Sequence, residues 1–578
     1  MSLVASDFSP LAASVRPRVK APCGSAFVSR PMAADAGSPG RVVVAMLAFV
    51  VIYGLIAARL IDLGLSDETE ASGYIGAQQA ITASRPDLVD RNGELLASDI
   101  KAPSLYAEPR KILDVDEAID KLSSVLPELG SDAVRRRLDS NAGFVWLKRE
   151  LTPLQRDAIH RLGIPGIGFL TENRRFYPGG ATASHVVGIA NVDEQGIAGL
   201  EKYIDGQGIA DLQQFGFATD QALKPVKLSM DLRVQHVVRD ELTKAMERYK
   251  AIASIGIVLD VHTGEVMAMS SLPDFDPNDP AEALKPENLN RATAGVYEMG
   301  SVFKTFSIAM ALDSGKVTPD DKFDASKPIC IGGFTIHDFH NMHRALSVSE
   351  IFVHSSNIGT ARMTLDVGID QQQEFFKRLG LLDKVQTELP EVVNPLLPRK
   401  WTDIVAMTAS FGHGISVSPM QTAVAGAALM NGGLLIEPTF FPRTRAQAEK
   451  VAKRVTSKRV SDIMRYLFRL NAVEGSGRSA RVPGYMVGGK TGTADKIVNG
   501  RYAHDKRRNS FMAAFPMDDP QYLVLVTLDE PKPEEGKRFA TAGWNAAPTV
   551  SKIIARIAPM LGVVPHVTED SDTMLVSY

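Results

Sequence analysis

Runs of apolar residues along the second half of the chain predict strands and helices in alternation. Residues 253–271, ASIGIVLDVHTGEVMAMSS, form two extended apolar runs around a tight Thr-Gly turn. Three more extended runs follow at 484–496, 510–516 and 522–530. Amphipathic helices are predicted at 234–249 and at 546–561. Five strands with helices between and after them indicate an antiparallel sheet covered on both faces.

Residues 297–315, YEMGSVFKTFSIAMALDSG, read as a buried helix with a lysine among apolar residues. Ser301 suits an N-cap or first-turn position, and Gly315 fits a C-terminal cap. The spacing i, i+3 places Lys304 on the same face as Ser301, one turn further along. The two side chains are therefore predicted to meet.

The predicted burial of Lys304 affects whether its amine can act as a base. Desolvation lowers the pKa of a buried amine, so that a neutral, proton-accepting Lys304 becomes attainable. A serine hydroxyl needs such a base to act as a nucleophile. The alternative is a helix cap followed by a lysine that reaches solvent, and Ser-x-x-Lys alone is too common to exclude it.

The amino-terminal part predicts a membrane anchor. Residues 1–41 are rich in Ala, Pro and Ser and carry more basic than acidic residues, which is typical of a disordered tail. Residues 42–58 are uncharged and mostly apolar, and a single transmembrane helix is predicted over 42–62. The positive-inside rule places the N-terminus in the cytoplasm and everything after residue 65 outside it. A cleaved signal peptide is the less favoured alternative, because the preceding tail is long.

The exported part divides near residue 228. Residues 65–228 contain SRPDLVDRNGELLASD (84–99), a strand, an Asn-Gly turn and a strand, within an irregular α+β module that we interpret as a non-catalytic pedestal. Residues 229–562 hold the predicted sheet and helices, and 563–578 form a tail. The predicted fold class is therefore α/β (α+β).

Composition narrows the function. The chain has 578 residues, 45% apolar and 23% charged, and its net charge of −3 argues against a nucleic-acid partner. Cys23 and Cys330 would lie on opposite sides of the membrane and could not pair. No Cys or His spacing indicates a structural zinc site.

Two further polar motifs follow Ser301 along the chain. HSSNIG places Ser355 and Asn357 in a Ser-x-Asn pair, and GGKTGT supplies Lys490, Thr491, Gly492 and Thr493 on a strand that looks like a sheet edge. Each motif alone is most often turn or hairpin chemistry. The three together, in this order and on helix, loop and strand, match the pattern of penicillin-interacting serine enzymes.

From about residue 80 to about 562 the sequence resembles the class B penicillin-binding proteins. The resemblance is carried by DRNGELLA, RRFYPGGATASHVVGI, GIAGLEKYIDG, NRATAGVYEMGSVFKTF and SFGHGISVSPMQTAVAGAALMNGG. Within the family, Ser-x-Asn resembles the division-specific FtsI branch, whereas the elongation-specific branch usually has Ser-x-Asp. Met299, Val302 and Pro86 stand where Pro, Thr and Gly are frequent, and none of these departures removes a catalytic atom.

The resemblance implies a serine β-lactamase-like transpeptidase fold and D,D-transpeptidase chemistry on peptidoglycan stem pentapeptides. Ser301 would be the nucleophile, Lys304 its base, Ser355 a proton relay and Asn357 a holder of the donor peptide amide. Lys490 would help to keep Lys304 neutral and, with Thr491 and Thr493, attract the substrate carboxylate.

The resemblance also implies partners and a location. The backbone N–H groups of Ser301 and Thr493 would form the oxyanion hole, and Gly492 would let the strand approach the substrate. β-Lactams would be covalent inhibitors, and a SEDS-type membrane glycosyltransferase and division-complex proteins would be partners at the inner membrane. We expect no metal and no organic cofactor.

Other interpretations remain open on the sequence. His337, His340 and His343 could bind a metal if their segment were helical. A β-lactamase would use a glutamate to hydrolyse its acyl-enzyme, and Glu391, with Asn394 nearby, offers a weak candidate. A membrane-bound β-lactam sensor, an inactive scaffold and an elongation-specific transpeptidase are the remaining alternatives.

Overall fold

The computed structural model describes residues 46–47, 49–57, 85–206, 224–537 and 539–566. The chain separates into two compact units, residues 1–82 and 83–578. In the first unit, residues 46–47 and 49–57 are helical and fall inside the predicted membrane span. Across the described residues, no helix has both the length and the apolar character needed to cross a membrane. The predicted tail at 1–41, residues 567–578 of the predicted tail at 563–578 and the ends of the predicted span lie outside the described residues.

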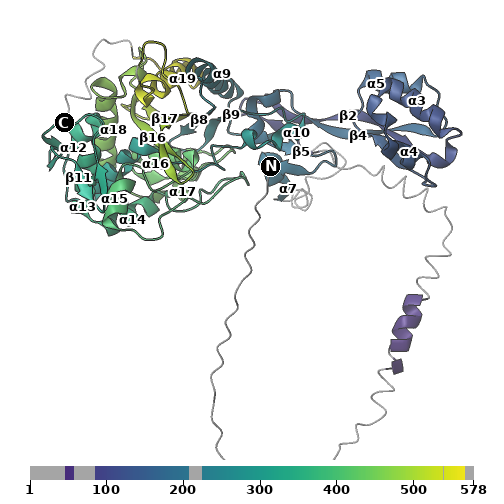
Figure 1. Cartoon of the computed structure of the whole chain (residues 1–578), viewed down its shortest axis with the longest axis horizontal. Helices are drawn as coiled ribbons and strands as arrows, with labels where there is room; N and C mark the ends of the chain where they lie inside the picture. The colour runs from purple at the N-terminus through teal and green to yellow at the C-terminus, as the bar shows by residue number, and fades with distance from the viewer. Residues whose placement is uncertain (1–45, 48, 58–84, 207–223, 538, 567–578) are drawn as a thin grey trace, which may run out of the picture. The chain divides into compact units, whose positions relative to one another are not determined.

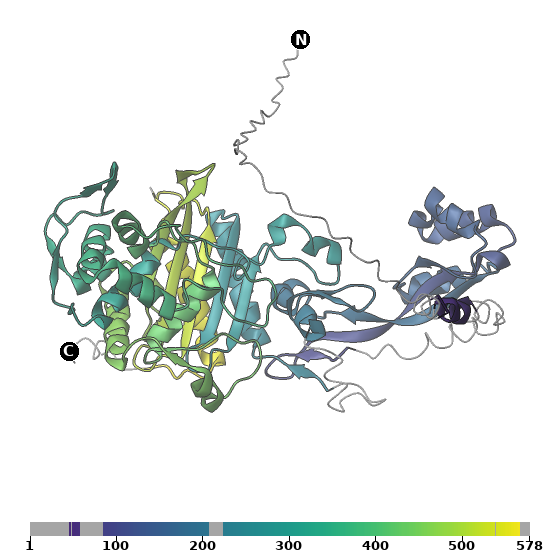
Figure 2. The same cartoon turned by 90° about the horizontal axis from the view of Figure 1, so that it is seen from below.

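A five-stranded antiparallel sheet organises most of the second unit, as the sequence predicts (Figure 1). Its strand order is β16-β17-β18-β8-β9, with β16 at one edge. The strands span Gly488–Val498 (β16), Arg501–Phe515 (β17), Tyr522–Asp529 (β18), Ala253–Asp260 (β8) and Val266–Leu272 (β9). Figure 2 shows the two strands from 253–272 lying beside the C-terminal strands.

Helices cover both faces of this sheet, which explains why β8, β9 and β18 are largely apolar along their length. Neighbouring residues of a strand point to opposite faces. Leu523 and Leu525 of β18 accordingly join one core cluster, and Val524 and Val526 join the other. The second cluster lies under α9 (Leu232–Tyr249) and α19 (Ala546–Met560). The first lies under α11 (Lys304–Asp313), α16 (Pro419–Met430) and α18 (Lys458–Val473).

The remaining elements of this region connect the sheet to its helices. The helices are α10 (Pro280–Ala283), α12 (Val348–His354), α13 (Asn357–Val367), α14 (Ile369–Arg378), α15 (Asp403–Ser410) and α17 (Arg445–Val451). The short strands are β10 (Lys322–Asp324), β11 (Ile329–Ile331), β12 (Phe334–Ile336), β13 (Ala345–Ser347), β14 (Leu434–Leu435) and β15 (Lys453–Arg454). The 3₁₀ helices are η4 (Pro286–Asn288), η5 (Gly300–Phe303), η6 (Arg478–Ala480) and η7 (Ala542–Trp544).

The part before residue 228 is an irregular α+β module, as predicted. The strand-turn-strand expected at 84–99 is present, because β1 (Leu88–Val89) pairs antiparallel with β2 (Leu95–Ala107). The other strands are β3 (Val145–Lys148), β4 (Ile167–Phe176), β5 (Ile189–Ala190), β6 (Gly196–Ala198) and β7 (Val226–Lys227). The helices are η1 (Pro109–Lys111), α3 (Val115–Val125), η2 (Pro127–Gly130), α4 (Asp132–Leu138), α5 (Pro153–His160), η3 (Gly180–Ala183), α6 (Ser184–Val187) and α7 (Gly199–Gly206).

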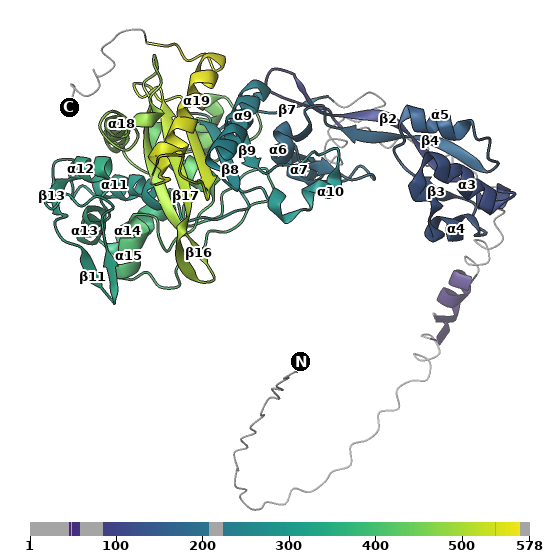
Figure 3. The ribbon, with the colours of Figure 1, turned by 45° about the horizontal axis from the view of Figure 1, so that its top comes forward.

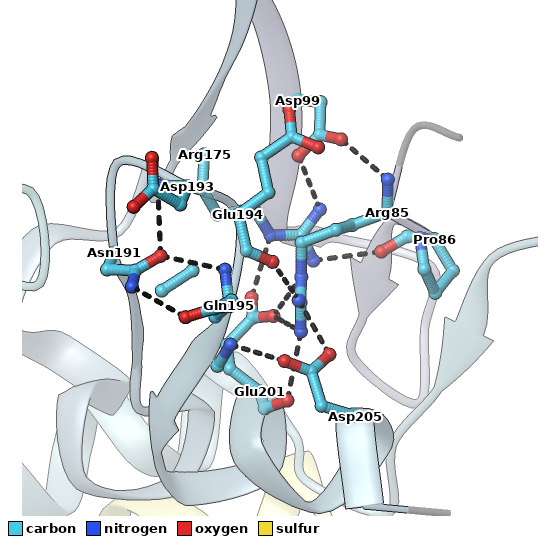
Figure 4. A network of polar contacts seen from close by, with 12 residues as sticks. Arg85, Pro86, Asp99, Arg175, Asn191, Asp193, Glu194, Gln195, Glu201 and Asp205 are labelled. Carbon is cyan, nitrogen blue, oxygen red and sulfur yellow. Dashed lines mark hydrogen bonds and ion pairs between the residues drawn. The ribbon is translucent and has the colours of Figure 1, made fainter. Parts of the chain in front are cut away.

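A buried ionic network fastens this module together (Figure 4). Glu201 on α7 is fully buried and accepts hydrogen bonds from Nε of Arg85 at 2.9 Å and from Nε of Arg175 at 2.7 Å. Arg175 also donates to Asp99 on β2 at 3.0 Å and to the carbonyl of Pro86 at 2.8 Å. One carboxylate therefore joins α7, β4 and the segment that leads into β1.

Replacing Glu201 with glutamine should lower the free energy of unfolding by about 3 kcal/mol or more, because it leaves two buried guanidinium groups short of a counter-charge. Urea denaturation of the full chain measures this loss. Glu128→Gln is the matched control, since its exposed carboxylate pairs with Lys148 at the surface and should contribute less than about 1 kcal/mol. Equal losses in the two variants would contradict a structural role for the network.

Candidate active site

A cavity of about 610 Å³ brings the three sequence motifs together. Ser301, Ser355, Asn357, Thr491 and Thr493 all line it. The other lining residues are Phe339, His340, His354, His413, Gly475, Ser476, Arg478, Ser479, Asp495, Arg507, Thr541, Ala542, Gly543 and Trp544. Residues more than 150 positions apart in the sequence thus share one site.

Ser301 lies in the 3₁₀ turn η5, immediately before α11. Lys304 is the first residue of α11, and its Nζ lies 2.8 Å from the Ser301 Oγ. The predicted meeting of the two side chains is confirmed. Gly300 has a φ of +55°, and a Cβ there would lie 2.7 Å from the carbonyl oxygen of Thr493. The sequence Gly-Ser therefore lets the nucleophile turn approach the edge strand β16 closely.

Ser355 and Asn357 lie at the junction of α12 and α13, two helices that are labelled in Figure 3. Ser355 ends α12 in the left-handed conformation, with a φ of +58° that few residues other than glycine adopt. Asn357 begins α13, and Ser356 caps that helix by accepting the N–H of Gly359. The junction turns the Ser355 carbonyl and hydroxyl toward Lys304, at 2.7 and 3.1 Å from Nζ.

Lys304 is completely buried and surrounded by oxygen atoms. Besides Ser301 and Ser355, its Nζ contacts the Oδ1 of Asn357 at 2.7 Å. Burial holds the pKa of Lys304 well below its usual range, and the charge of Lys490 lowers it further, while Asp338 opposes both. These effects favour the neutral amine.

Lys490 is the second fully buried lysine and comes from the edge strand β16. Its Nζ donates to the Ser355 Oγ at 3.0 Å, so Ser355 lies between the two lysines. Burial lowers the pKa of Lys490 to about 7. Its ammonium also lies over the ring of Phe352, 5.6 Å from the centroid, which offers partial compensation for lost water.

The structure indicates that glycine is needed at position 492 for a reason other than the predicted approach of the strand to the substrate. A Cβ at this position would lie 2.4 Å from the carbonyl oxygen of Met299. The missing side chain therefore permits β16 to pack against the backbone that leads to Ser301. The predicted close approach to substrate concerns the other side of the strand, where Thr491 and Thr493 face the cavity.

Several lining residues carried no functional prediction. Ser476 hydrogen-bonds the Thr491 hydroxyl at 2.6 Å, and His413 and Asp495 add titratable groups to the wall. Ser476 lies in the Gly-rich stretch EGSGRS, which reads as an ordinary loop. Only the fold places it beside Thr491, and no pattern in the sequence announces that contact.

Two alternative candidates are not assembled into sites. The segment 337–343 is not helical, so the spacing of its three histidines does not bring them onto one face. Within the described residues, no group of three or more Cys, His, Asp or Glu is arranged to hold a metal ion. Glu391 accepts the N–H of Gly199 on α7 at 3.2 Å and is absent from the described lining of the cavity. Nothing there resembles the water-activating glutamate of a hydrolase.

The fold and the site define a class. A serine hydroxyl beside a buried lysine, a second lysine on an edge strand and a five-stranded antiparallel sheet between helices characterise the penicillin-interacting serine enzymes. Comparison with known families gives the narrower assignment. Residues 255–555 match the penicillin-binding protein transpeptidase domain, and residues 80–208 match the penicillin-binding protein dimerisation domain. The chain belongs to the penicillin-binding protein family, in its class B.

Related sequences and structures agree with this assignment. The chain is 41% identical to a probable peptidoglycan D,D-transpeptidase FtsI of Caulobacter vibrioides, over 84% of this chain and 83% of that protein. It is 32% identical to PenA of Neisseria gonorrhoeae, over 93% and 95%, and 29% identical to FtsI of Escherichia coli, over 86% of each. Penicillin-binding protein 3 of Mycobacterium tuberculosis, complexed with ampicillin, has the same fold, with a TM-score of 0.64 at 23% identity over 84% of this chain and 97% of that one.

Proposed function

We propose that the protein is a serine D,D-transpeptidase that cross-links peptidoglycan stem peptides through an acyl-enzyme at Ser301. The observation that carries the proposal is the 2.8 Å contact between the Ser301 hydroxyl and a fully buried lysine amine. The relatives from Caulobacter vibrioides, Neisseria gonorrhoeae and Escherichia coli, which cover most of the chain, are named as peptidoglycan D,D-transpeptidases or probable ones, which supports the same chemistry.

The hydrogen-bond partners of Lys304 can accommodate the neutral amine that its burial favours. The Ser355 carbonyl and the Asn357 carboxamide oxygen only accept, so they take the two N–H bonds of a neutral amine. The Nδ2 of Asn357 donates to the carbonyl of His337, which fixes the orientation of the carboxamide. The lone pair of Lys304 then faces the Ser301 hydroxyl, which can donate.

This arrangement supports acyl transfer in two steps. Ser301 Oγ attacks the carbonyl carbon of the penultimate D-Ala while Lys304 accepts its proton, and the peptide bond breaks as the terminal D-Ala leaves with a proton relayed through Ser355. The amine of a second stem peptide then attacks the ester, its proton passes to the same groups, and Ser301 recovers its hydroxyl hydrogen. No water and no cofactor enters the balance.

The edge strand supplies the groups that bind the substrate. The Thr491 and Thr493 hydroxyls and the charge of Lys490 suit the terminal carboxylate of the donor stem. The backbone N–H groups of Ser301 and Thr493 suit an oxyanion, a contact worth about 10²- to 10³-fold in rate. The carboxamide of Asn357 hydrogen-bonds to Lys304 and to the carbonyl of His337, which is a structural role that the sequence did not indicate.

The sequence and the relatives also support a proposed cellular role. Ser-x-Asn at 355–357 and the FtsI name of the Caulobacter relative support a role in septal wall synthesis. A predicted span at 42–62 supports a single-pass inner-membrane protein with an external catalytic region. A SEDS-type glycosyltransferase and division-complex proteins are the proposed partners, and β-lactams the proposed inhibitors.

Stem pentapeptides test the function directly. The full chain, incubated with a pentapeptide donor and an acceptor peptide carrying a free amine, should release one D-Ala for each cross-linked dimer formed, as counted by mass spectrometry. Release of D-Ala with hydrolysed donor and no dimer would indicate a hydrolase. Acylation by penicillin without any release of D-Ala from the peptides would indicate a sensor.

A further inference from the structure

The short segment after β12 holds the Ser355–Asn357 turn from outside. The Asp338 carboxylate accepts the hydroxyl of Ser356 at 2.6 Å and the backbone N–H of Ile358 at 2.9 Å. The neighbouring carbonyl of His337 accepts the Nδ2 of Asn357 at 2.8 Å. Three consecutive residues of the turn are thus tied to two consecutive residues of this segment.

The turn needs such support because its conformation is unfavourable in isolation. Ser355 occupies the left-handed region between α12 and α13, and residues other than glycine are held there only by their surroundings. A carboxylate at the start of α13 also satisfies a free N–H group and interacts favourably with the helix dipole. Asp338 therefore stabilises the one backbone geometry that turns Ser355 and Asn357 toward Lys304.

The same carboxylate acts on the charge balance of the site. Three charged or titratable neighbours surround Lys304 from different elements: Lys490 on β16, Asp338 after β12 and His413 after α15. Burial lowers the pKa of Lys304, Lys490 lowers it further and Asp338 raises it. Burial lowers the pKa of His413 as well, which disfavours the charged imidazolium, while Glu298 raises that pKa.

We propose that Asp338 is a positioning residue for transpeptidation, which holds the Ser355–Asn357 turn against Lys304 through its hydrogen bonds to Ser356 and Ile358. This inference rests on the proposed function of Ser301 and Lys304. Asp338 is not among the described residues that line the cavity, although the next two residues, Phe339 and His340, are. Its effect on the reaction passes through the turn and through Lys304.

Acylation by a fluorescent penicillin, measured against pH with the full chain, tests the proposal. The neutral base reacts, so the rate rises with pH through the pKa of Lys304. Asp338→Asn keeps an acceptor for Ile358 but removes the charge that raises this pKa, so the rising limb should move to lower pH. Asp338→Ala loses both acceptors, and its maximal rate should fall by about 10²-fold, as expected when a catalytic group is misplaced.

Asp324→Asn is the matched control. This exposed carboxylate on β10 forms an ion pair, at 3.7 Å, with Arg362 on α13, the helix that begins at Asn357. It makes no contact with the Ser355–Asn357 turn. Its pH profile should equal that of the wild type. Thermal unfolding identifies any variant that fails to fold. If Asp338→Ala fails to fold, the pH profile of Asp338→Asn alone tests the proposal.

The outcomes separate the two proposals. A wild type that is not acylated overturns the proposed function. An acylated wild type whose rising limb is unmoved in Asp338→Asn overturns the positioning role, because a merely structural contact lowers the rate at every pH and leaves the limb in place. A limb that moves equally in Asp324→Asn overturns it as well, since any nearby charge would then have the same effect.

Discussion

Replacing Ser301 with alanine is expected to abolish the covalent adduct that the protein forms with penicillin. Ser301 Oγ lies 2.8 Å from the Lys304 amine, which can accept its proton as the oxygen attacks a carbonyl carbon. Without it, the β-lactam ring has no nucleophile at the cavity floor. Intact-protein mass spectrometry after exposure to a labelled penicillin measures the loss as the disappearance of the adduct peak.

Ser307→Ala is the matched control for this experiment. Ser307 lies on α11, the helix that follows Ser301, and is fully buried, but its hydroxyl donates to the carbonyl of Ser410 at 2.8 Å. This variant should keep the adduct. A stable adduct in Ser301→Ala would move the nucleophile to another residue, and rapid loss of the wild-type adduct with hydrolysed penicillin would favour a β-lactamase.

Replacing Lys304 with methionine should lower the rate of acylation by about 10²- to 10⁴-fold while leaving Ser301 in place. Methionine has a similar length and no basic atom, so the Ser301 proton loses its acceptor. Stopped-flow measurement with the fluorescent penicillin gives the rate constant. Lys316→Met is the control, because that exposed lysine donates only to the carbonyl of Val367. A rate constant within threefold of the wild-type value would show that another group takes the proton. A threefold change corresponds to about 0.6 kcal/mol in activation free energy.

Lys304→Met should also change how the free energy of unfolding depends on pH. The pKa of Lys304 in the folded protein is well below its usual value, so the unfolded chain binds a proton that the folded chain lacks. Between these two pKa values the free energy of unfolding rises with pH, by at most about 1.4 kcal/mol per pH unit. We expect the wild type to gain stability more steeply than Lys304→Met as the pH increases from neutral toward 10. Equal slopes in urea denaturation would mean that Lys304 is protonated in the folded state.

Much of the fold could be predicted from the sequence because its patterns are local. The continuous apolar runs at β8, β9 and β18 predict strands buried on both faces, and the amphipathic period of α9 predicts a surface helix. The Gly-rich turns and the Asn-Gly turn fix where strands end. Strand order is not local, so the sequence did not predict the pairing of β18 with β8, which lies more than 250 residues earlier.

The sequence predicted which residues form the candidate site, but it did not predict all of the contacts between them and their neighbours. The i, i+3 spacing of Ser301 and Lys304 forces their side chains onto one helix face, whatever surrounds them. Ser476 and Asp338 lie in stretches with no periodicity or motif, and their roles depend on which segment packs beside them. Gly492 shows the same limit, because the sequence indicates a close approach but not the backbone that approaches.

The sequence by itself determined which residue types carry the chemistry, where each lies on helix, turn or strand, and which family the chain resembles. Only the tertiary structure decided that Lys304 is buried among four oxygen atoms, that Lys490 faces Ser355 from across the site, and that Asp338 and Ser476 support the motifs. The physical reason is that proton affinity depends on burial and on charges within a few ångströms, and these neighbours come from segments that are distant in the chain.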